Sequence, residues 1–216
     1  MPRYSTTFIL VAVYLLSAIG GCAGQQPAPD SSAFRSPVPG DLSAETQKVL
    51  KEIEQTRPVS ADEKSRLRNV ISDLNLSTSA KNADEESVIR AAGLPVIPIA
   101  DAMLLSSDVA TRQKAADGLC VLTVSLARTP DWEKGSRALL LISRRSLLDK
   151  DTTVRLYALS ILEGVGFRSR DNLPTGLAAA LEEAIQDPEA RIRARAQSVK
   201  EFIGLAPRDP KAPIPN

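Results

Sequence analysis

A short pattern of acidic, basic and small residues occurs three times in the second half of the chain. Residues 108–115, 151–158 and 187–194 all have the form Asp-x-x-x-Arg-x-x-Ala. Arg112 and Arg155 are 43 residues apart, and Arg155 and Arg191 are 36 residues apart. These separations are close to the period at which helix pairs repeat in helical-repeat proteins. Each unit of such a protein buries its apolar side mainly against its neighbours, so this repetition strongly limits the folds open to the chain.

An apolar segment with helical spacing precedes each copy of the pattern. These segments are residues 98–105, 132–148 and 173–185. No stretch shows sustained alternation of apolar and polar residues, which would indicate a half-buried strand. The sequence therefore predicts an all-α fold in which two helices form one repeat.

The second helix of each unit resembles that of bacterial HEAT-like repeats, in which Asp-Pro-x-Val-Arg-x-x-Ala-x-x-Ala-Leu is common. The run Leu-Pro-Val-Ile-Pro-Ile-Ala-Asp-Ala-Met-Leu-Leu at 94–105 resembles the first helix of such a unit. The resemblance covers about residues 94–204. It implies a short right-handed α-solenoid of HEAT-like helix pairs.

The shared Asp, Arg and Ala have a structural explanation. An Asp at the start of a helix caps free N–H groups, and an Arg four residues later reaches its own Asp or that of a neighbouring repeat. The small Ala lets two helices approach closely. We therefore expect a scaffold ladder, rather than a ligand site, from Asp108, Arg112, Asp151, Arg155, Asp187 and Arg191.

The third copy departs from the pattern after its Ala. Gln197 and Ser198 replace the small residue and the Leu of the repeat. A second apolar stripe is available there, which would turn the helix slightly, as expected of a terminal capping repeat. Its members are Ile192, Ala196, Val199 and Ile203.

Composition shifts divide the chain into segments. We expect residues 22–42 to be a disordered tether, 93–206 to hold the repeats and 207–216, with four prolines, to be a disordered tail. Residues 43–92 form N-terminal helices or a degenerate repeat. Within them Ser60 and Glu63 have the spacing of a capping box, so a helix should begin after Ser60.

The N-terminus has the parts of a secretory signal. Arg3 precedes an apolar run, and small residues lead to Cys22. The apolar segment 8–19 is shorter than the roughly 20 residues of a spanning helix, which disfavours a transmembrane anchor. Ile19-Gly20-Gly21-Cys22 resembles the lipobox of bacterial lipoproteins. The resemblance implies that residues 1–21 are removed and that Cys22 is acylated, with palmitate among the usual chains, which would hold the protein on a membrane.

The residue after Cys22 bears on the destination. In diderm bacteria of the familiar sorting type an Asp there favours the inner membrane, whereas this chain has Ala23. We therefore expect the outer membrane, facing the periplasm, if the host is diderm. Cleavage by ordinary signal peptidase, with Cys22 an incidental residue, is the alternative.

Charge and composition exclude several functions. The chain has 27 basic and 26 acidic residues, and loss of Arg3 with the signal makes it neutral, which argues against nucleic-acid binding. The chain has no His, so Ser-His-Asp sites, Cys-His sites and imidazole-bound metals are excluded. No nucleotide-binding or hydrolase motif occurs. We expect no enzyme, cofactor or metal.

Few residues are candidates for a binding site. Arg168 and Arg170, in an expected loop after the second repeat, could contact an anion or be solvated. Trp132 could anchor a partner or pack at the start of its helix. Cys120, in an apolar helix interior, is expected to be a buried small hydrophobe rather than a reactive thiol.

The function expected from these features is a lipid-anchored envelope scaffold or adaptor that presents the helical repeats to a protein partner. The alternative is a lipoprotein that binds a small molecule or a cell-wall ligand without catalysis. Residues off the core stripe of the second helices should face the partner. They are Gln113, Asp117, Ser160, Glu163 and Arg195.

Overall fold

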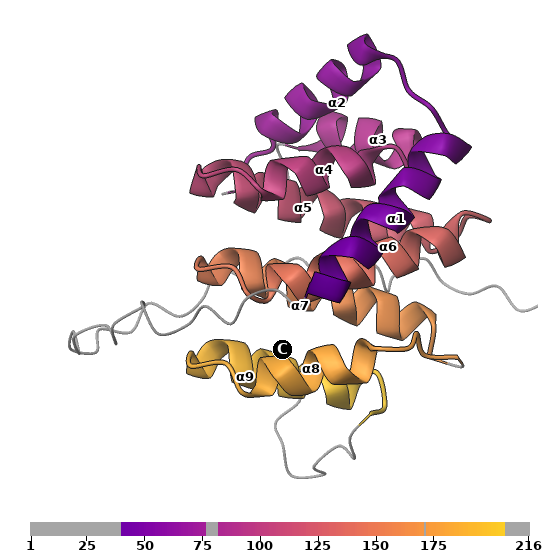
Figure 1. Ribbon diagram of the computed structural model, residues 1–216. Coiled ribbons are helices and arrows are strands. Elements are labelled where there is room, and N and C mark those ends of the chain that lie inside the picture. Colours follow the sequence, from indigo (N-terminus) through magenta and orange to yellow (C-terminus); the bar gives the residue numbers. More distant parts are fainter. Residues whose placement is uncertain (1–39, 77–81, 171, 206–216) are drawn as a thin grey trace, which may run out of the picture. The chain divides into compact units, whose positions relative to one another are not determined.

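The computed structural model describes residues 40–76, 82–170 and 172–205, and the backbone of this part is helical, without a strand (Figure 1). The all-α class is therefore confirmed. The expected signal peptide, Cys22, most of the tether and the tail lie outside these residues. The described helices are α1 (Gly40–Thr56), α2 (Ala61–Asp73), α3 (Ala83–Ala92), α4 (Val96–Leu104), α5 (Val109–Leu126), α6 (Trp132–Ser146), α7 (Thr152–Arg168), α8 (Leu177–Ile185) and α9 (Ala190–Phe202).

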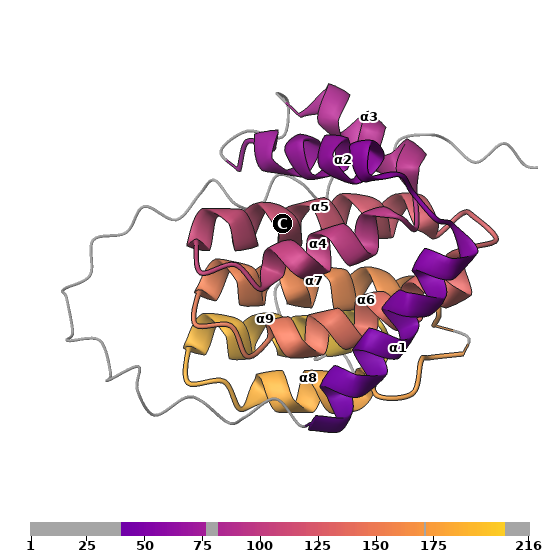
Figure 2. The ribbon, with the colours of Figure 1, turned by 45° about the horizontal axis from the view of Figure 1, so that its top comes forward.

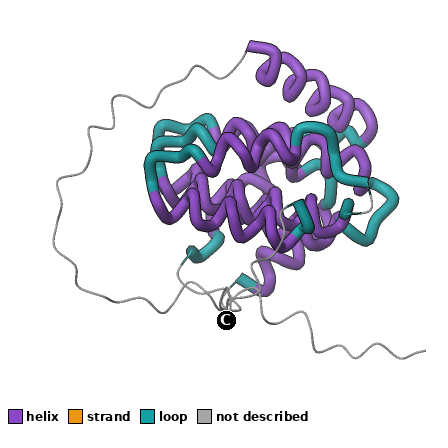
Figure 3. The backbone as a smooth tube through the Cα atoms, turned by 90° about the horizontal axis from the view of Figure 1, so that it is seen from below, coloured by secondary structure: helices purple, strands orange, loops and turns teal. Residues whose placement is uncertain are grey.

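Six of these helices form three successive pairs, α4–α5, α6–α7 and α8–α9 (Figure 1). The second helices pack on one another, α5 on α7 and α7 on α9, and α3 continues this layer beyond α5. The first helices α4, α6 and α8 lie in the other layer. Figure 3, viewed from below, shows the two layers together with the short loops that join them.

The N-terminal helices are arranged differently from the pairs. Helices α2 and α3 pack on each other and against α4 and α5. Helix α1 does not continue that series: it runs diagonally across the first-helix layer and packs against α6 and α4 (Figure 2). The segment predicted as N-terminal helices or a degenerate repeat is thus one helix pair and one covering helix.

Side-chain caps fix the start of three helices. Ser60 Oγ accepts a hydrogen bond from Glu63 N at 3.1 Å, which confirms the predicted cap of α2. In the repeats, Asp108 accepts from Thr111 N at 2.7 Å and Asp151 from Val154 N at 3.0 Å. These bonds satisfy N–H groups that have no partner within the helix.

The predicted frame of the third repeat was wrong by two residues. Glu189, not Asp187, is the N-cap of α9, and Arg191 is exposed. The second stripe, Ile192, Ala196, Val199 and Ile203, forms the core face. Arg193 and Ala196 therefore occupy the places of Arg and Ala in the pattern, because only this frame turns the apolar residues of α9 inward.

Helix α8 begins later than expected. Residues 173–176 form a turn that ends at Gly176, whose φ is 95°, and the helix starts at Leu177. A positive φ suits glycine because it has no Cβ. The buried residues of α8 are Leu177, Ala180, Leu181 and Ala184, which follow the i, i+3, i+4, i+7 spacing of one helix face.

Very close packing joins the second helices near their C-terminal ends. A Cβ at Gly164 would lie 2.8 Å from the Thr123 side chain of α5, and one at Gly166 would lie 2.8 Å from Ile203.

Among the described helices, none is by itself long and apolar enough to cross a membrane, although the bent pair α3 and α4, at 116°, meets those criteria together.

Candidate functional site

The expected ladder of Asp and Arg exists in part: Arg155 pairs with Asp187 of the next repeat as predicted, whereas Arg112 pairs with Asp149, which lies outside the pattern. Arg112 is buried, and its Nε and Nη2 donate to the two carboxylate oxygens of Asp149 at 2.8 and 3.1 Å. Its Nη1 donates to the carbonyls of Ser106 and Ser107. The guanidinium thus connects the start of α5 to Asp149, which lies two residues before Asp151, the N-cap of α7.

Arg155 repeats this arrangement one unit later. Its Nε lies 3.0 Å from Asp187 Oδ2, and Nη2 lies 3.1 Å from Glu189 Oε2. Its Nη1 donates to the Asp149 carbonyl at 2.8 Å. Arg193, in the last repeat, donates to the carbonyls of Asp187 and Pro188. Each guanidinium of this ladder donates to backbone carbonyls within the fold, and those of Arg112 and Arg155 also pair with carboxylates, which gives the ladder a structural role.

The residues expected to face a partner lie together across α5, α7 and α9 but are half-buried. Glu163 pairs with Arg195 at 2.5 Å, and Gln113 donates to Asp151 at 3.0 Å. Ser160 donates back to the Leu156 carbonyl of its own helix. Much of this predicted surface therefore serves contacts between the repeats.

Asp117 and Cys120 lie on the same face of α5. Burial, and then the nearby Glu86 carboxylate, raise the pKa of Asp117 to about 6. Burial also raises the pKa of the Cys120 thiol, which donates to the Tyr157 carbonyl at 3.5 Å. Cys120 was predicted to be a buried small hydrophobe; it is half-buried and packs against the core. Its raised pKa argues against a reactive thiolate.

An exposed apolar stripe crosses the ends of the second helices. It consists of Val124 on α5, Phe167 on α7 and Phe202 on α9, which are 60, 51 and 57 % exposed. The two rings stack with centroids 5.3 Å apart, and Arg170 lies over Phe167 at 5.8 Å. Sequence reasoning missed this stripe, although Val124 and Phe167 occupy the same position after Arg112 and Arg155.

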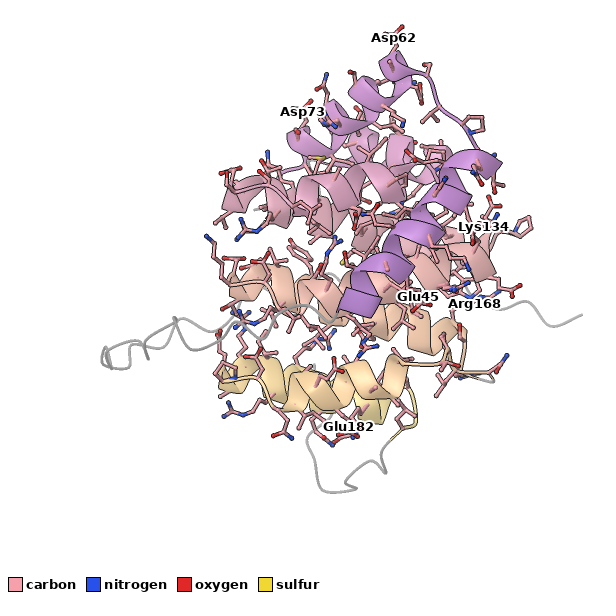
Figure 4. The ribbon with its side chains drawn as sticks, in the orientation of Figure 1. Glu45, Asp62, Asp73, Lys134, Arg168 and Glu182 are labelled. Carbon is pink, nitrogen blue, oxygen red and sulfur yellow. The ribbon has the colours of Figure 1, made fainter. Side chains whose placement is uncertain are left out.

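A cleft of about 800 Å³ lies between α1, α6, the end of α7 and the α7–α8 connection. We call it the Trp132 cleft. Figure 4 shows Glu45 of α1 and Arg168 of α7 in the same region. The lining residues are Glu45, Trp132, Glu133, Ser136, Arg137, Leu140, Leu141, Arg144, Arg168, Ser169, Asn172, Pro174, Thr175 and Gly176.

Two of the three predicted candidates meet in this cleft. Trp132 is half-buried at the start of α6, and its Nε1 donates to Ser169 Oγ at 3.3 Å. Arg168 is the last residue of α7 rather than part of a loop, because the helix continues to Ser169 as its C-cap. Arg170 is not in the lining. The contribution of α1 could not be foreseen, because no local pattern indicates that this helix crosses α6.

No group of three or more Cys, Asp or Glu side chains in the described part of the chain could hold a metal ion. No protein-family profile matches the sequence, and no curated protein is similar to it.

Proposed function

We propose that this chain is a lipid-anchored scaffold or adaptor of a bacterial envelope that presents a HEAT-like α-solenoid to a protein partner. The proposal combines the lipobox-like sequence ending at Cys22 with the repeated packing of α4 to α9. In the corrected frame Arg112, Arg155 and Arg193 have the same role in successive pairs, which supports a true structural repeat.

The observation that carries the binding role is the stripe of Val124, Phe167 and Phe202. These large apolar side chains are more than half exposed, and the rings of Phe167 and Phe202 stack on each other. Such a group of exposed apolar side chains is unfavourable in water unless another surface covers it. Aromatic residues are also enriched at the centres of protein interfaces. Arg170 beside the stacked rings adds a cation that favours an acidic rim on the partner.

The test is capture of the partner from detergent-solubilised envelope with tagged chains. The variant carries Phe167→Ser and Phe202→Ser, and the control carries Leu105→Ser. Leu105 is 64 % exposed and lies after α4, before the start of α5, whereas Val124 lies near the end of α5. All three changes remove an exposed apolar side chain, so their effects on folding should be similar and small.

We expect a protein that copurifies in fixed ratio with wild type and with Leu105→Ser. The amount recovered per tagged chain should fall at least tenfold with the variant that carries Phe167→Ser and Phe202→Ser. A partner retained equally by all three chains would refute the role of the stripe.

The second candidate function, binding of a small molecule or cell-wall ligand, is favoured only by the Trp132 cleft, whose volume lies within the range of small-ligand sites.

A further inference from the structure

The polar groups of the Trp132 cleft are not all used by the fold. Arg137 pairs with Glu45 at 3.1 Å, and Arg144 pairs with Glu183 at 2.7 Å. Arg168 has neither an ion pair nor a hydrogen bond with any described residue. In addition, the buried Nε of Arg144 has no acceptor in the described part of the chain. The cleft thus offers donors that are left over after the fold is complete.

The rest of the lining is suited to an apolar body with polar groups at one side. The buried Leu140 and Leu141 line the cleft about two turns further along α6 than the half-buried indole of Trp132. Ser169, Asn172 and Thr175 supply hydroxyl and amide groups next to Arg168. Small-ligand sites commonly combine an apolar lining with a few placed polar groups of this kind.

Charge restricts the ligand further. Among the described lining residues the carboxylates are Glu45, which is paired with Arg137, and Glu133, which has no described cation within ion-pairing distance. A guanidinium attracts an oxyanion and binds it with charge-assisted hydrogen bonds. The nearby carboxylate repels additional negative charge. This balance favours one negative charge over two.

We propose that the Trp132 cleft binds an amphipathic monocarboxylate, with the carboxylate at Arg168 and the apolar body on Trp132, Leu140 and Leu141. This site goes beyond the adaptor role, since its lining includes none of the residues of the apolar stripe. The carboxylate belongs either to the C-terminus of a short peptide or to a small organic acid.

Binding in this cleft can be followed by the fluorescence of the protein itself. Trp132 is the only tryptophan in the sequence, so emission excited at the red edge of indole absorption comes from the cleft. The probes are acetyl-Leu-Leu with a free carboxylate, its C-terminal amide and octanoate. The amide keeps the body of the peptide and removes the charge. Comparing the peptide acid with octanoate distinguishes the two sources of the carboxylate.

We expect a saturable change in emission of the full chain with at least one of the two carboxylates, and binding at least tenfold weaker for the amide. Arg168→Gln should weaken binding about tenfold, as expected for loss of a charge-assisted contact near solvent. Glu133→Gln should strengthen it. Arg170→Gln is the matched control, because Arg170 is an exposed cation two residues from Arg168 but outside the lining.

Several results would overturn the proposal. One is the absence of a saturable change with both carboxylates up to about 10 mM, the range of negligible affinity. Another is equal binding of acid and amide, which would leave the charge without a role. Equal weakening by Arg168→Gln and Arg170→Gln would show an effect of overall charge alone. Thermal melts of the variants check that each remains folded.

Discussion

At the scale of single residues, two buried arginines connect neighbouring helix pairs. Each guanidinium donates to one or two carbonyls just before its own helix and pairs with a carboxylate just before the second helix of the next pair. Removing one partner of a buried ion pair leaves the other without compensation, and this is more destabilising than the pair is stabilising. The arginines therefore specify which helix ends meet as well as contributing to stability.

Arg155→Met should lower the free energy of unfolding by about 3–5 kcal/mol, because it leaves the buried Asp187 carboxylate without its cation. Arg191→Met is the control, since Arg191 is exposed and takes no part in the contacts of the ladder. It should change stability by less than about 0.5 kcal/mol. Denaturant unfolding followed by circular dichroism measures both, and equal effects would contradict the corrected frame.

Asp117 gives a prediction about pH. Its pKa is raised from 3.8 to about 6 by burial and by Glu86. Below pH 4 the group is protonated in both folded and unfolded chains. Between pH 4 and 6 only the unfolded chain ionises, so the folded state loses stability as the pH rises, and the loss is complete above pH 6.

Asp117→Asn should therefore be more stable than wild type near pH 7.5, by on the order of 1 kcal/mol, and the gain should shrink as the pH falls towards 4. Thermal melting of both proteins across this range tests the expectation. A gain that does not depend on pH, or a loss of stability at pH 7.5, would show that Asp117 is ionised without penalty in the folded protein.

At the scale of helices, local sequence patterns predicted much of the fold but only a small part of the candidate site. Helical spacing and the caps at Ser60, Asp108 and Asp151 predicted where α2, α5 and α7 begin. The start of α9 was missed because two acidic residues, Asp187 and Glu189, are two positions apart and both suit an N-terminus. The burial of α9 decides between them, and burial depends on neighbours that a local pattern does not contain.

The candidate site was predicted only in part. Trp132 and Arg168 were identified as unusual residues, but they are 36 positions apart and come together only through the packing of α6 on α7. The stripe was missed because Phe167 and Phe202 resemble core residues in sequence. Their exposure follows from their place at helix ends, where no other described helix covers them.

The packing of α7 against its neighbours gives a test of the repeat. Ala158 has no exposed surface and occupies the small position of the central unit. Ala158→Leu should cost about 1–3 kcal/mol, because the added volume has no space to enter. The control is Ala179→Leu on α8, where the side chain is exposed and the change should be nearly neutral.

Ala180, which the sequence suggested as an exposed control, is buried and unsuitable. Thermal denaturation of the two variants and of wild type measures the difference. A stable Ala158→Leu protein would contradict close packing at the central repeat, even if its spectrum remained helical.

At the scale of the whole molecule, the proposed anchor and the proposed partner surface belong to different parts of the chain. Cys22→Ser should abolish incorporation of labelled fatty acid and leave an uncleaved precursor. The mature wild type should partition with membranes, because each buried methylene contributes roughly 0.8 kcal/mol. Unchanged processing and unchanged partitioning of the variant would refute the lipoprotein assignment.

The most direct test of the account is site-specific photo-crosslinking in the bacterium that makes this chain. A photoreactive phenylalanine replaces Phe167 in one strain and Leu105 in another, since both side chains are large, apolar and exposed. The account predicts one discrete crosslinked protein from position 167, absent from position 105 and lost when Phe202 is changed to Ser. No product from position 167, or the same products from both positions, would contradict the proposal that this stripe is where the adaptor holds its partner.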